Sequence, residues 1–542
     1  MANRPIASDR LQGTRLPSTL VIMRLHRGRL AVPSTLLALS LVLAGCTSFS
    51  DTVGKDAAAT TSVAPEPEVA PIEWTDCNDQ IRKLVAGQPG SDRDLSFECD
   101  LSYDVPITYH EPQGATLPLF VVRVVSGTQT DRIGSLVVNP GGPGASGADA
   151  AIGLALTLPE EVLARFDIVG FDPRGVGSST PVKCISDQRK DELIASEPRP
   201  VSDQQLDAAF ALSQEIADGC ATEYGDALGT FNTVDTARDM DRLRTALGDE
   251  KLTYLGYSYG TTLGSTYAEL FPDKVRGMVL DAAVDPDVDA VKDAEQSAAA
   301  LENGFDAFAA NCVGLLAGCP IGAEPRQFVE QVLGQAAQAP IPSSEPGETR
   351  QATPGVVVTA VQAALYDTAS WPQLSQALAA ARNGDSKGLF SLADSYSGRL
   401  ANGTYSNLFD ANIAINCADR DDKLAASEIR RLAADWNAKY PLFGAGNAAG
   451  LYTCSVWEAQ RTPLPERDAQ GSAPIVVVGN SGDPVTPLPG AVDLAENLAS
   501  GVLLTWQGQG HTAYPKTDCV KAAVDAYLID LTVPLDGLTC PA

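Results

Sequence analysis

The hydrophobic positions of this 542-residue chain form short apolar runs separated by longer stretches with helical spacing. The runs are too short for helices and rich in Val, Ile and Leu, which is typical of strands buried on both faces of a sheet. The pattern predicts an α/β fold with a mostly parallel, doubly wound sheet. Strands are expected at 120–124, 136–138, 166–170, 252–255, 278–280, 475–478 and 502–504.

The stretch from 287 to 470 contains no apolar run of comparable strength. It contains Ala-rich segments with helical spacing, such as 290–312, 326–337 and 356–383. A chain of this length also exceeds what one core comfortably holds. We therefore expect a mainly helical lid at 287–470, inserted into a core that is made of 72–286 and 471–542.

The N-terminal segment has a different character from the rest. Its basic start is followed by an apolar stretch at 36–43 and by Leu43-Ala44-Gly45-Cys46. This order predicts a lipoprotein signal peptide over 1–45, with Met23 as a candidate start and Cys46 as the lipid-bearing N-terminus. Plain secretion is the alternative. Residues 46–71, rich in Ala, Thr, Ser, Pro and acids, predict a disordered tether, so membrane association is expected through lipidated Cys46 only.

Cysteine usage and charge fit an extracytoplasmic protein. Of eleven cysteines, ten remain after Cys46, an even number that is typical of disulfides in an oxidising compartment. Pairing each cysteine with its neighbour predicts Cys77–Cys99, Cys184–Cys220, Cys312–Cys319, Cys417–Cys454 and Cys519–Cys540. With three histidines and no Cys-x-x-Cys, neither a metal site nor a cofactor is expected. A formal net charge of −29 makes nucleic acid an improbable partner.

The candidate nucleophile is Ser258, in Gly256-Tyr257-Ser258-Tyr259-Gly260, between an apolar run and a helix-compatible segment. A serine at a strained strand-to-helix turn exposes its hydroxyl, and flanking glycines remove the Cβ atoms that would clash there. The helix N-terminus that follows points backbone N–H groups at the place where an oxyanion forms.

A second glycine-rich loop, Asn139-Pro140-Gly141-Gly142-Pro143-Gly144, follows the expected strand at 136–138. Such a loop can turn a backbone N–H inward. We expect the oxyanion hole to consist of the N–H groups of Tyr259 and Gly142, with Gly141 as the second choice.

The candidate base is His511, the one histidine that follows Ser258 in the chain. The candidate acid is Asp483, in the loop after the expected strand at 475–478. Asp285 is the next choice, and Asp281 is expected to be a structural residue at a strand end. The order serine, acid, histidine is that of an acyl-transfer triad on a parallel sheet.

Together with Phe171-Asp172-Pro173-Arg174-Gly175, these motifs resemble the tripeptidyl aminopeptidases of actinomycetes, relatives of the proline iminopeptidases, from about Val105 to the C-terminus. The resemblance implies an α/β-hydrolase fold and a secreted or cell-envelope serine exopeptidase. Its substrates would be peptides with a free N-terminus. Asn139-Pro140 stands where proline iminopeptidases usually have a histidine, a departure from dedicated single-proline cleavage. Arg174 is expected to be an architectural hydrogen-bonder.

Two features of the sequence allow more than one interpretation. An exopeptidase must recognise an ammonium, and Asp419, with Glu458 behind it, is the candidate contact in the lid; solvated lid acids are the alternative. The same triad would also serve a cell-envelope carboxylesterase or lipase, and a catalytically silent peptide-binding lipoprotein is a third hypothesis.

Overall fold

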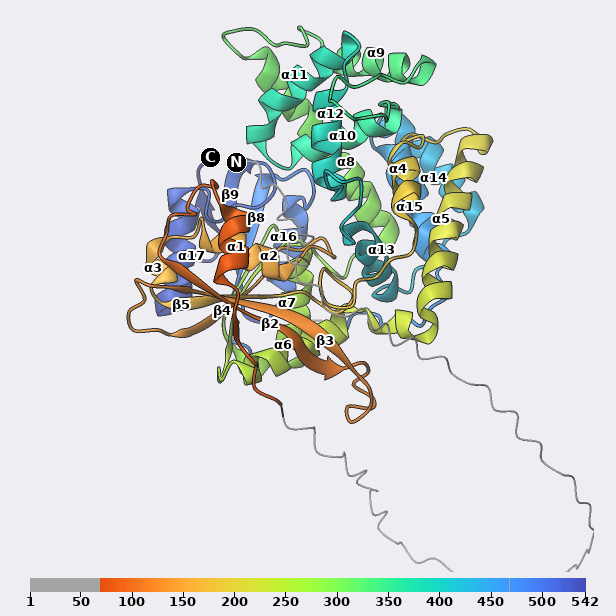
Figure 1. Cartoon of the computed structure of the whole chain (residues 1–542). Helices are drawn as coiled ribbons and strands as arrows, with labels where there is room; N and C mark the ends of the chain where they lie inside the picture. The colour runs from red at the N-terminus through yellow and green to blue at the C-terminus, as the bar shows by residue number, and fades with distance from the viewer. Residues whose placement is uncertain (1–68, 467) are drawn as a thin grey trace, which may run out of the picture.

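The computed structural model describes residues 69–466 and 468–542, whose strands form one ten-stranded sheet (Figure 1). The strand order is β1-β2-β3-β5-β4-β6-β7-β8-β9-β10. The pairs β1–β2, β2–β3 and β3–β5 are antiparallel, and all later pairs in this order are parallel. The prediction of a mostly parallel sheet is confirmed. The strands are β1 (Thr75–Asp76), β2 (Leu95–Pro106), β3 (Thr116–Ser126), β4 (Gly134–Asn139), β5 (Phe166–Phe171), β6 (Leu252–Tyr257), β7 (Val275–Asp281), β8 (Ile475–Gly482), β9 (Gly501–Gln509) and β10 (Leu538–Cys540).

All seven strands expected from the apolar runs are present, as β3 to β9. The hydrophobic pattern missed β1, β2 and β10, which lie toward the two edges of the sheet. β2 carries Glu98, Asp100 and Asp104 among its apolar residues and is partly exposed, so it contains no continuous apolar run. Edge strands are half-solvated, and their pattern is correspondingly weaker.

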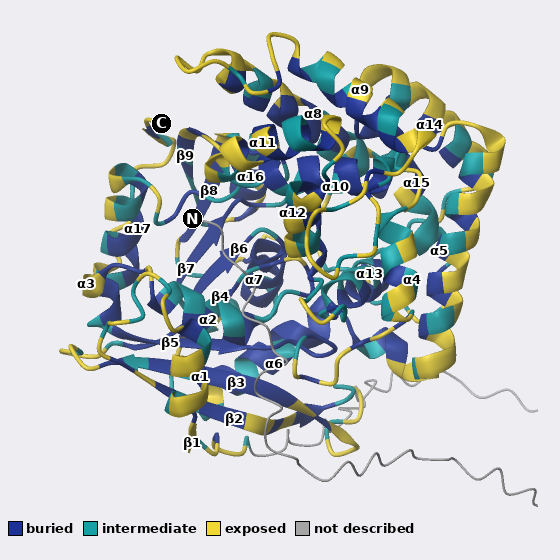
Figure 2. Ribbon diagram, turned by 45° about the horizontal axis from the view of Figure 1, so that its top comes forward, coloured by how far each residue is buried: buried dark blue, intermediate teal, exposed yellow. Residues whose placement is uncertain are grey.

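Helices cover both faces of the sheet, which buries its central strands completely (Figure 2). On β4, Leu136 and Val138 face one helix layer and Val137 faces the other. This two-sided burial explains the continuous apolar runs. The first layer contains α1 (Asn78–Val85), α2 (Gly147–Ala155), α3 (Glu160–Leu163) and α17 (Asp518–Asp530); the second contains α6 (Thr233–Ala246), α7 (Tyr259–Leu270) and α16 (Leu488–Asn497).

Between β7 and β8 the chain forms a block of helices, and in Figure 1 this block lies above and to the right of the sheet. Its larger core joins α8 to α12 and is built from residues such as Phe305, Val357 and Leu378. The helices are α8 (Ala290–Val313), α9 (Pro325–Gln338), α10 (Pro354–Leu365), the 3₁₀ turn η4 (Thr368–Ser370), α11 (Trp371–Arg382), α12 (Lys387–Ser397), α13 (Leu408–Ala418), α14 (Ala426–Lys439) and α15 (Gly444–Ser455). Two other 3₁₀ turns, η2 (Gly225–Thr230) and η3 (Pro272–Lys274), precede β7.

The helical block also includes α4 (Asp187–Ile194) and α5 (Asp203–Tyr224), although both lie within 72–286, the range predicted to belong to the core. The apolar face of α5 packs on α14 and α15 instead of the sheet, for example Phe210 stacked on Tyr452 with ring centroids 4.2 Å apart. We refer to α4, α5 and α8–α15 together as the lid.

All five predicted disulfides are present: Cys77–Cys99, Cys184–Cys220, Cys312–Cys319, Cys417–Cys454 and Cys519–Cys540. Five disulfides in one chain indicate an oxidising, extracytoplasmic compartment. Within the described residues, no helix combines the length and the apolar character needed to cross a bilayer. The predicted signal peptide, Cys46 and nearly all of the predicted tether lie outside the described residues.

Candidate active site

Ser258 occupies the turn between β6 and α7 with φ +55° and ψ −127°, in the left-handed half of backbone space that disfavours a side chain. A Cβ on Gly256 would lie 2.4 Å from the carbonyl oxygen of Gly260, and a Cβ on Gly260 would lie 2.8 Å from that of Asn139. The expected reason for both glycines is therefore confirmed. The turn presents Ser258 at the carboxyl ends of the parallel strands.

His511 and Asp483 lie side by side on the loops after β9 and β8. His511 Nδ1 lies 3.0 Å and 2.9 Å from the two carboxylate oxygens of Asp483. The buried carboxylate also accepts from the N–H groups of Val485 and Thr486 and from the Thr486 hydroxyl. Burial alone would raise the pKa of Asp483, but the His511 charge and these hydrogen bonds hold it below its usual value. The structure therefore brings together the predicted base and the first-choice acid.

Asp281, at the end of β7, joins the serine turn to the histidine loop. Its carbonyl oxygen accepts from the Ser258 N–H at 2.9 Å. Its buried carboxylate accepts from the N–H groups of Ala513, at 3.0 Å, and Tyr514, at 2.7 Å. Burial raises the pKa of Asp281 to about 6. Asp281 is thus the structural strand-end residue that was expected, and it draws the loop that carries His511 toward Ser258.

The predicted oxyanion loop lies against the serine turn. A Cβ on Gly141 would lie 2.9 Å from Ser258 Cβ and 3.0 Å from the Tyr259 nitrogen, so the loop approaches as closely as a glycine allows. The Gly141 N–H donates to Asn139 Oδ1. Among the described residues, the N–H groups of Gly142 and Tyr259 have no hydrogen-bond partner. Two unpaired donors beside the serine are what an oxyanion requires, and they favour Gly142 over Gly141.

Buried polar side chains fix the loops that follow β4 and β5. Arg174 is fully buried, forms a bidentate ion pair with Asp239, and donates to the carbonyl groups of Pro106, Ile107 and Thr230. Its predicted architectural role is confirmed. Asp172 accepts from Ser146 and from the N–H groups of Ala148 and Ser178, which joins the oxyanion loop to its neighbour.

The lid contacts the predicted base directly, a feature that the sequence did not reveal. The backbone carbonyl oxygen of Tyr366, at the end of α10, accepts from the backbone N–H of His511 at 2.8 Å. The two rings meet edge to face with centroids 5.3 Å apart. No motif marks Tyr366, because the contact depends on how the lid packs over the sheet.

The candidate ammonium contacts are placed differently from one another. Asp419 is buried at the end of α13, and its two oxygens accept from the N–H and the hydroxyl of Thr233, at 2.8 Å and 2.6 Å. Glu458 is exposed. The two acids therefore do not form one buried pocket. Contact of either with a substrate ammonium stays a prediction.

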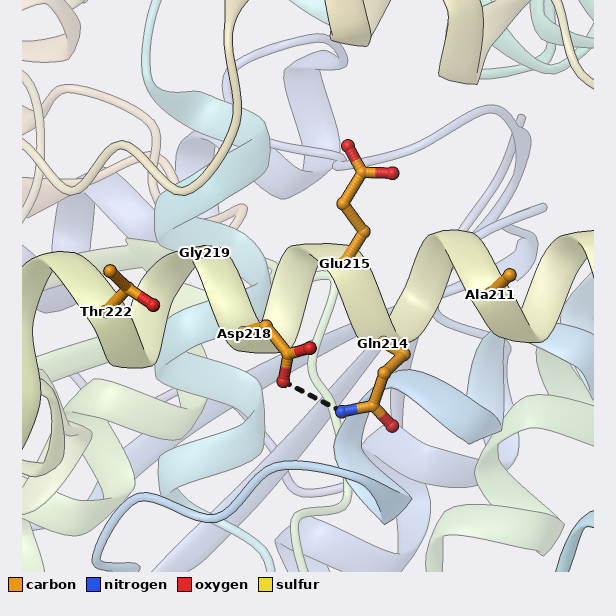
Figure 3. A pocket seen from close by; sticks show the side chains of 6 residues that line it. All are labelled: Ala211, Gln214, Glu215, Asp218, Gly219 and Thr222. Atoms are coloured by element: carbon orange, nitrogen blue, oxygen red, sulfur yellow. Dashed lines mark hydrogen bonds between the residues drawn. The ribbon is translucent and has the colours of Figure 1, made fainter.

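Figure 3 shows a pocket on one face of α5, lined by residues that include Gln214, Glu215 and Asp218. It lies on a single helix and holds none of the residues described above, so we assign it no part in the chemistry. Within the described part of the chain, no group of His, Cys, Asp and Glu side chains is placed to hold a metal ion.

Comparison with known proteins identifies relatives over almost the whole chain. A family model described as alpha/beta hydrolase fold matches residues 134–515. Serine protease Hip1 of Mycobacterium tuberculosis is 37% identical over 535 residues, covering 94% of this chain and 97% of Hip1. Carboxylesterase B of the same species is 34% identical, covering 88% and 91%. Tripeptidyl aminopeptidase of Streptomyces lividans is 30% identical, covering 87% of each chain.

Proposed function

Since the chain belongs to the α/β-hydrolase family and is a serine hydrolase, we propose that it is an exopeptidase that releases short peptides, tripeptides in the first place, from free N-termini. The observation that carries the proposal is the pairing of His511 with Asp483, together with Asp281, which joins the His511 loop to the Ser258 turn. Homologous serine protease and tripeptidyl aminopeptidase sequences support a peptide as the substrate.

In the proposed mechanism the Ser258 hydroxyl attacks the scissile carbonyl carbon while His511 Nε2 takes the hydroxyl proton. Asp483 holds the Nδ1 proton and stabilises the imidazolium. The N–H groups of Gly142 and Tyr259 bind the oxyanion. His511 then gives its proton to the leaving amine, and water releases the peptide from the acyl-enzyme by the same steps in reverse order.

The experiment that tests this function is digestion of a ladder of free-amine peptides by the mature protein, with the fragments identified by mass. We expect N-terminal trimming in steps of three residues, no cleavage of N-acetylated peptides, and no turnover by Ser258→Ala. Internal cuts would contradict exopeptidase action, and turnover by Ser258→Ala would contradict the assigned nucleophile.

A carboxylesterase is the second candidate, because carboxylesterase B is 34% identical to this chain. The same serine, histidine and carboxylate would serve an ester. Rates on tripeptidyl anilides and on short acyl esters separate the two functions: kcat/KM at least tenfold higher for the esters, with no release of tripeptides, would favour the carboxylesterase.

We also propose that Cys46 carries a lipid and that 46–71 tether the enzyme to the outer face of a membrane. A cysteine after Leu43-Ala44-Gly45 supports this proposal. Cys46→Ser should release active protein into the medium, whereas unchanged membrane retention would contradict the anchor.

A further inference from the structure

Helix α13 of the lid lies directly on the predicted oxyanion loop. A Cβ on Gly144 would lie 2.7 Å from the carbonyl oxygen of Leu408 and 3.1 Å from the Asn412 nitrogen, so the first turns of the helix touch the loop backbone. A Cβ on Gly142 would lie 3.5 Å from the Leu408 side chain. The position of α13 therefore limits where the Gly142 N–H can lie.

Asn412 connects the helix to the loop by a hydrogen bond of defined direction. Its Nδ2 donates to the Pro143 carbonyl oxygen at 3.1 Å. The amide of Asn416, one turn further along α13, donates to Asn412 Oδ1 at 3.2 Å. Because Oδ1 accepts from Asn416, the Nδ2 group of Asn412 is the one that faces Pro143, next to Gly142.

The other end of α13 reaches the second oxyanion donor. The Thr233 hydroxyl donates to Asp419, so its oxygen accepts from the Tyr259 hydroxyl. Burial and the nearby charge of Asp419 raise the pKa of Tyr259 well above its ordinary value, which keeps that hydroxyl protonated. Asp419 thus holds Tyr259, whose backbone N–H is the other predicted donor, through one intervening side chain.

Side chains at both ends of α13 tie it to the rest of the lid and to the segment before α4. Asp410 forms a buried ion pair with Lys190 and accepts from the Cys184 N–H. The Cys417–Cys454 disulfide joins α13 to α15. A helix held this firmly can position whatever it touches.

We propose that α13 sets the oxyanion hole, with Asn412 and Asp419 as positioning residues for the N–H groups of Gly142 and Tyr259. The inference rests on the proposed function, since it needs an oxyanion at Ser258. It gives Asp419 a role different from the ammonium contact predicted from sequence, and the two roles differ in their kinetic signatures.

The test uses Asn412→Leu and Asp419→Asn in the full chain. Removing a whole oxyanion donor costs roughly 10²–10³ in kcat, so misplacing one is expected to cost roughly 10-fold. We expect that fall in kcat with KM within about twofold, equally for tripeptidyl anilides and for short acyl esters. Binding of a peptide boronic acid, which mimics the tetrahedral state, should weaken by the same factor as kcat/KM.

The matched controls change similar groups elsewhere in the lid. Asn447→Leu removes an amide that donates within α15, and Glu302→Gln neutralises a buried acid that is paired with Arg326. Both are expected to leave kcat within about twofold. Should Asp419→Asn fail to fold, Tyr259→Phe removes the same connection without a change of charge, and a fall in kcat of roughly threefold or more is expected.

Unchanged kcat in Asn412→Leu together with unchanged kcat in Tyr259→Phe would overturn the proposal. A rise in KM confined to free-amine substrates in Asp419→Asn would also overturn it and would assign Asp419 to the ammonium. Failure of the proposed function has separate signs, because internal cuts in the peptide ladder would contradict exopeptidase action, and activity retained by Ser258→Ala would contradict the assigned nucleophile.

Discussion

Asp483→Asn is a sharp test of the predicted triad, because the structure determines how the new amide must lie. The N–H groups of Val485 and Thr486 both donate to Asp483 Oδ1, at 2.9 Å and 3.0 Å. An asparagine would keep its oxygen at that position and place its NH₂ at the position of Oδ2. That position is 2.9 Å from His511 Nδ1.

An NH₂ group there donates to Nδ1 and favours the imidazole tautomer with its proton on Nε2, where the proton of Ser258 must be received. The wrong tautomer costs roughly 10³–10⁴ in kcat, which corresponds to about 4–5 kcal/mol of transition-state stabilisation. Substrate binding does not depend on the tautomer, so KM should change little.

The assay is steady-state hydrolysis of a tripeptidyl anilide, corrected for folded protein by thermal unfolding. Asp285→Asn, which changes the second-choice acid, is the matched control and should keep kcat within about twofold. Retention of more than a tenth of the wild-type kcat by Asp483→Asn, or an equal loss in Asp285→Asn, would refute the assignment of the acid.

Three further predictions follow from buried contacts. Gly141→Ala should lower kcat at least roughly 100-fold, because its Cβ would lie 2.5 Å from the Tyr257 carbonyl oxygen and would push the oxyanion loop away from the serine turn. A tripeptidyl anilide assay checks this, and wild-type activity would contradict it. Arg174→Met leaves Asp239 buried without its cation and should cost about 3–5 kcal/mol in urea unfolding; a loss below about 1 kcal/mol would contradict the buried pair. The raised pKa of Asp281, about 6, means that the folded state binds this proton more tightly than the unfolded chain does. Its stabilising contribution is therefore full below about pH 4 and is lost as the pH rises to about 6, by up to about 3 kcal/mol. Asp281→Asn should lack that part of the pH dependence in urea unfolding at pH 4 and pH 6.5, and an unchanged slope would contradict it.

Much of the core could be predicted from sequence because its constraints are local. A strand buried on both faces needs an apolar run, and all seven such runs became β3 to β9. The Ser258 turn needs small residues on both sides, and Gly256 and Gly260 supply them. The strands at the sheet edges lack a continuous apolar run and were missed.

The membership of the lid shows where local patterns fail. α5 is amphipathic, but nothing in its pattern says whether its apolar face covers the sheet or other helices. Phe210 of α5 packs on α15 because the two helices lie side by side in the folded lid. In the sequence, 241 positions separate Phe210 from Leu451 of the same cluster.

The sequence by itself determined the seven strands β3 to β9 and the serine, histidine and aspartate that the triad hypothesis names, since each is specified by residue type, chain order or scarcity. For the disulfides it offered only the simplest pairing of neighbours, and the structure decided the connectivity. Only the tertiary structure decided that Asp281 joins two loops, that Tyr366 contacts His511 and that Asp419 is held by Thr233. These are contacts between residues far apart in the chain. Such contacts depend on how helices pack over a sheet, and packing is a property of the whole molecule that no single segment encodes.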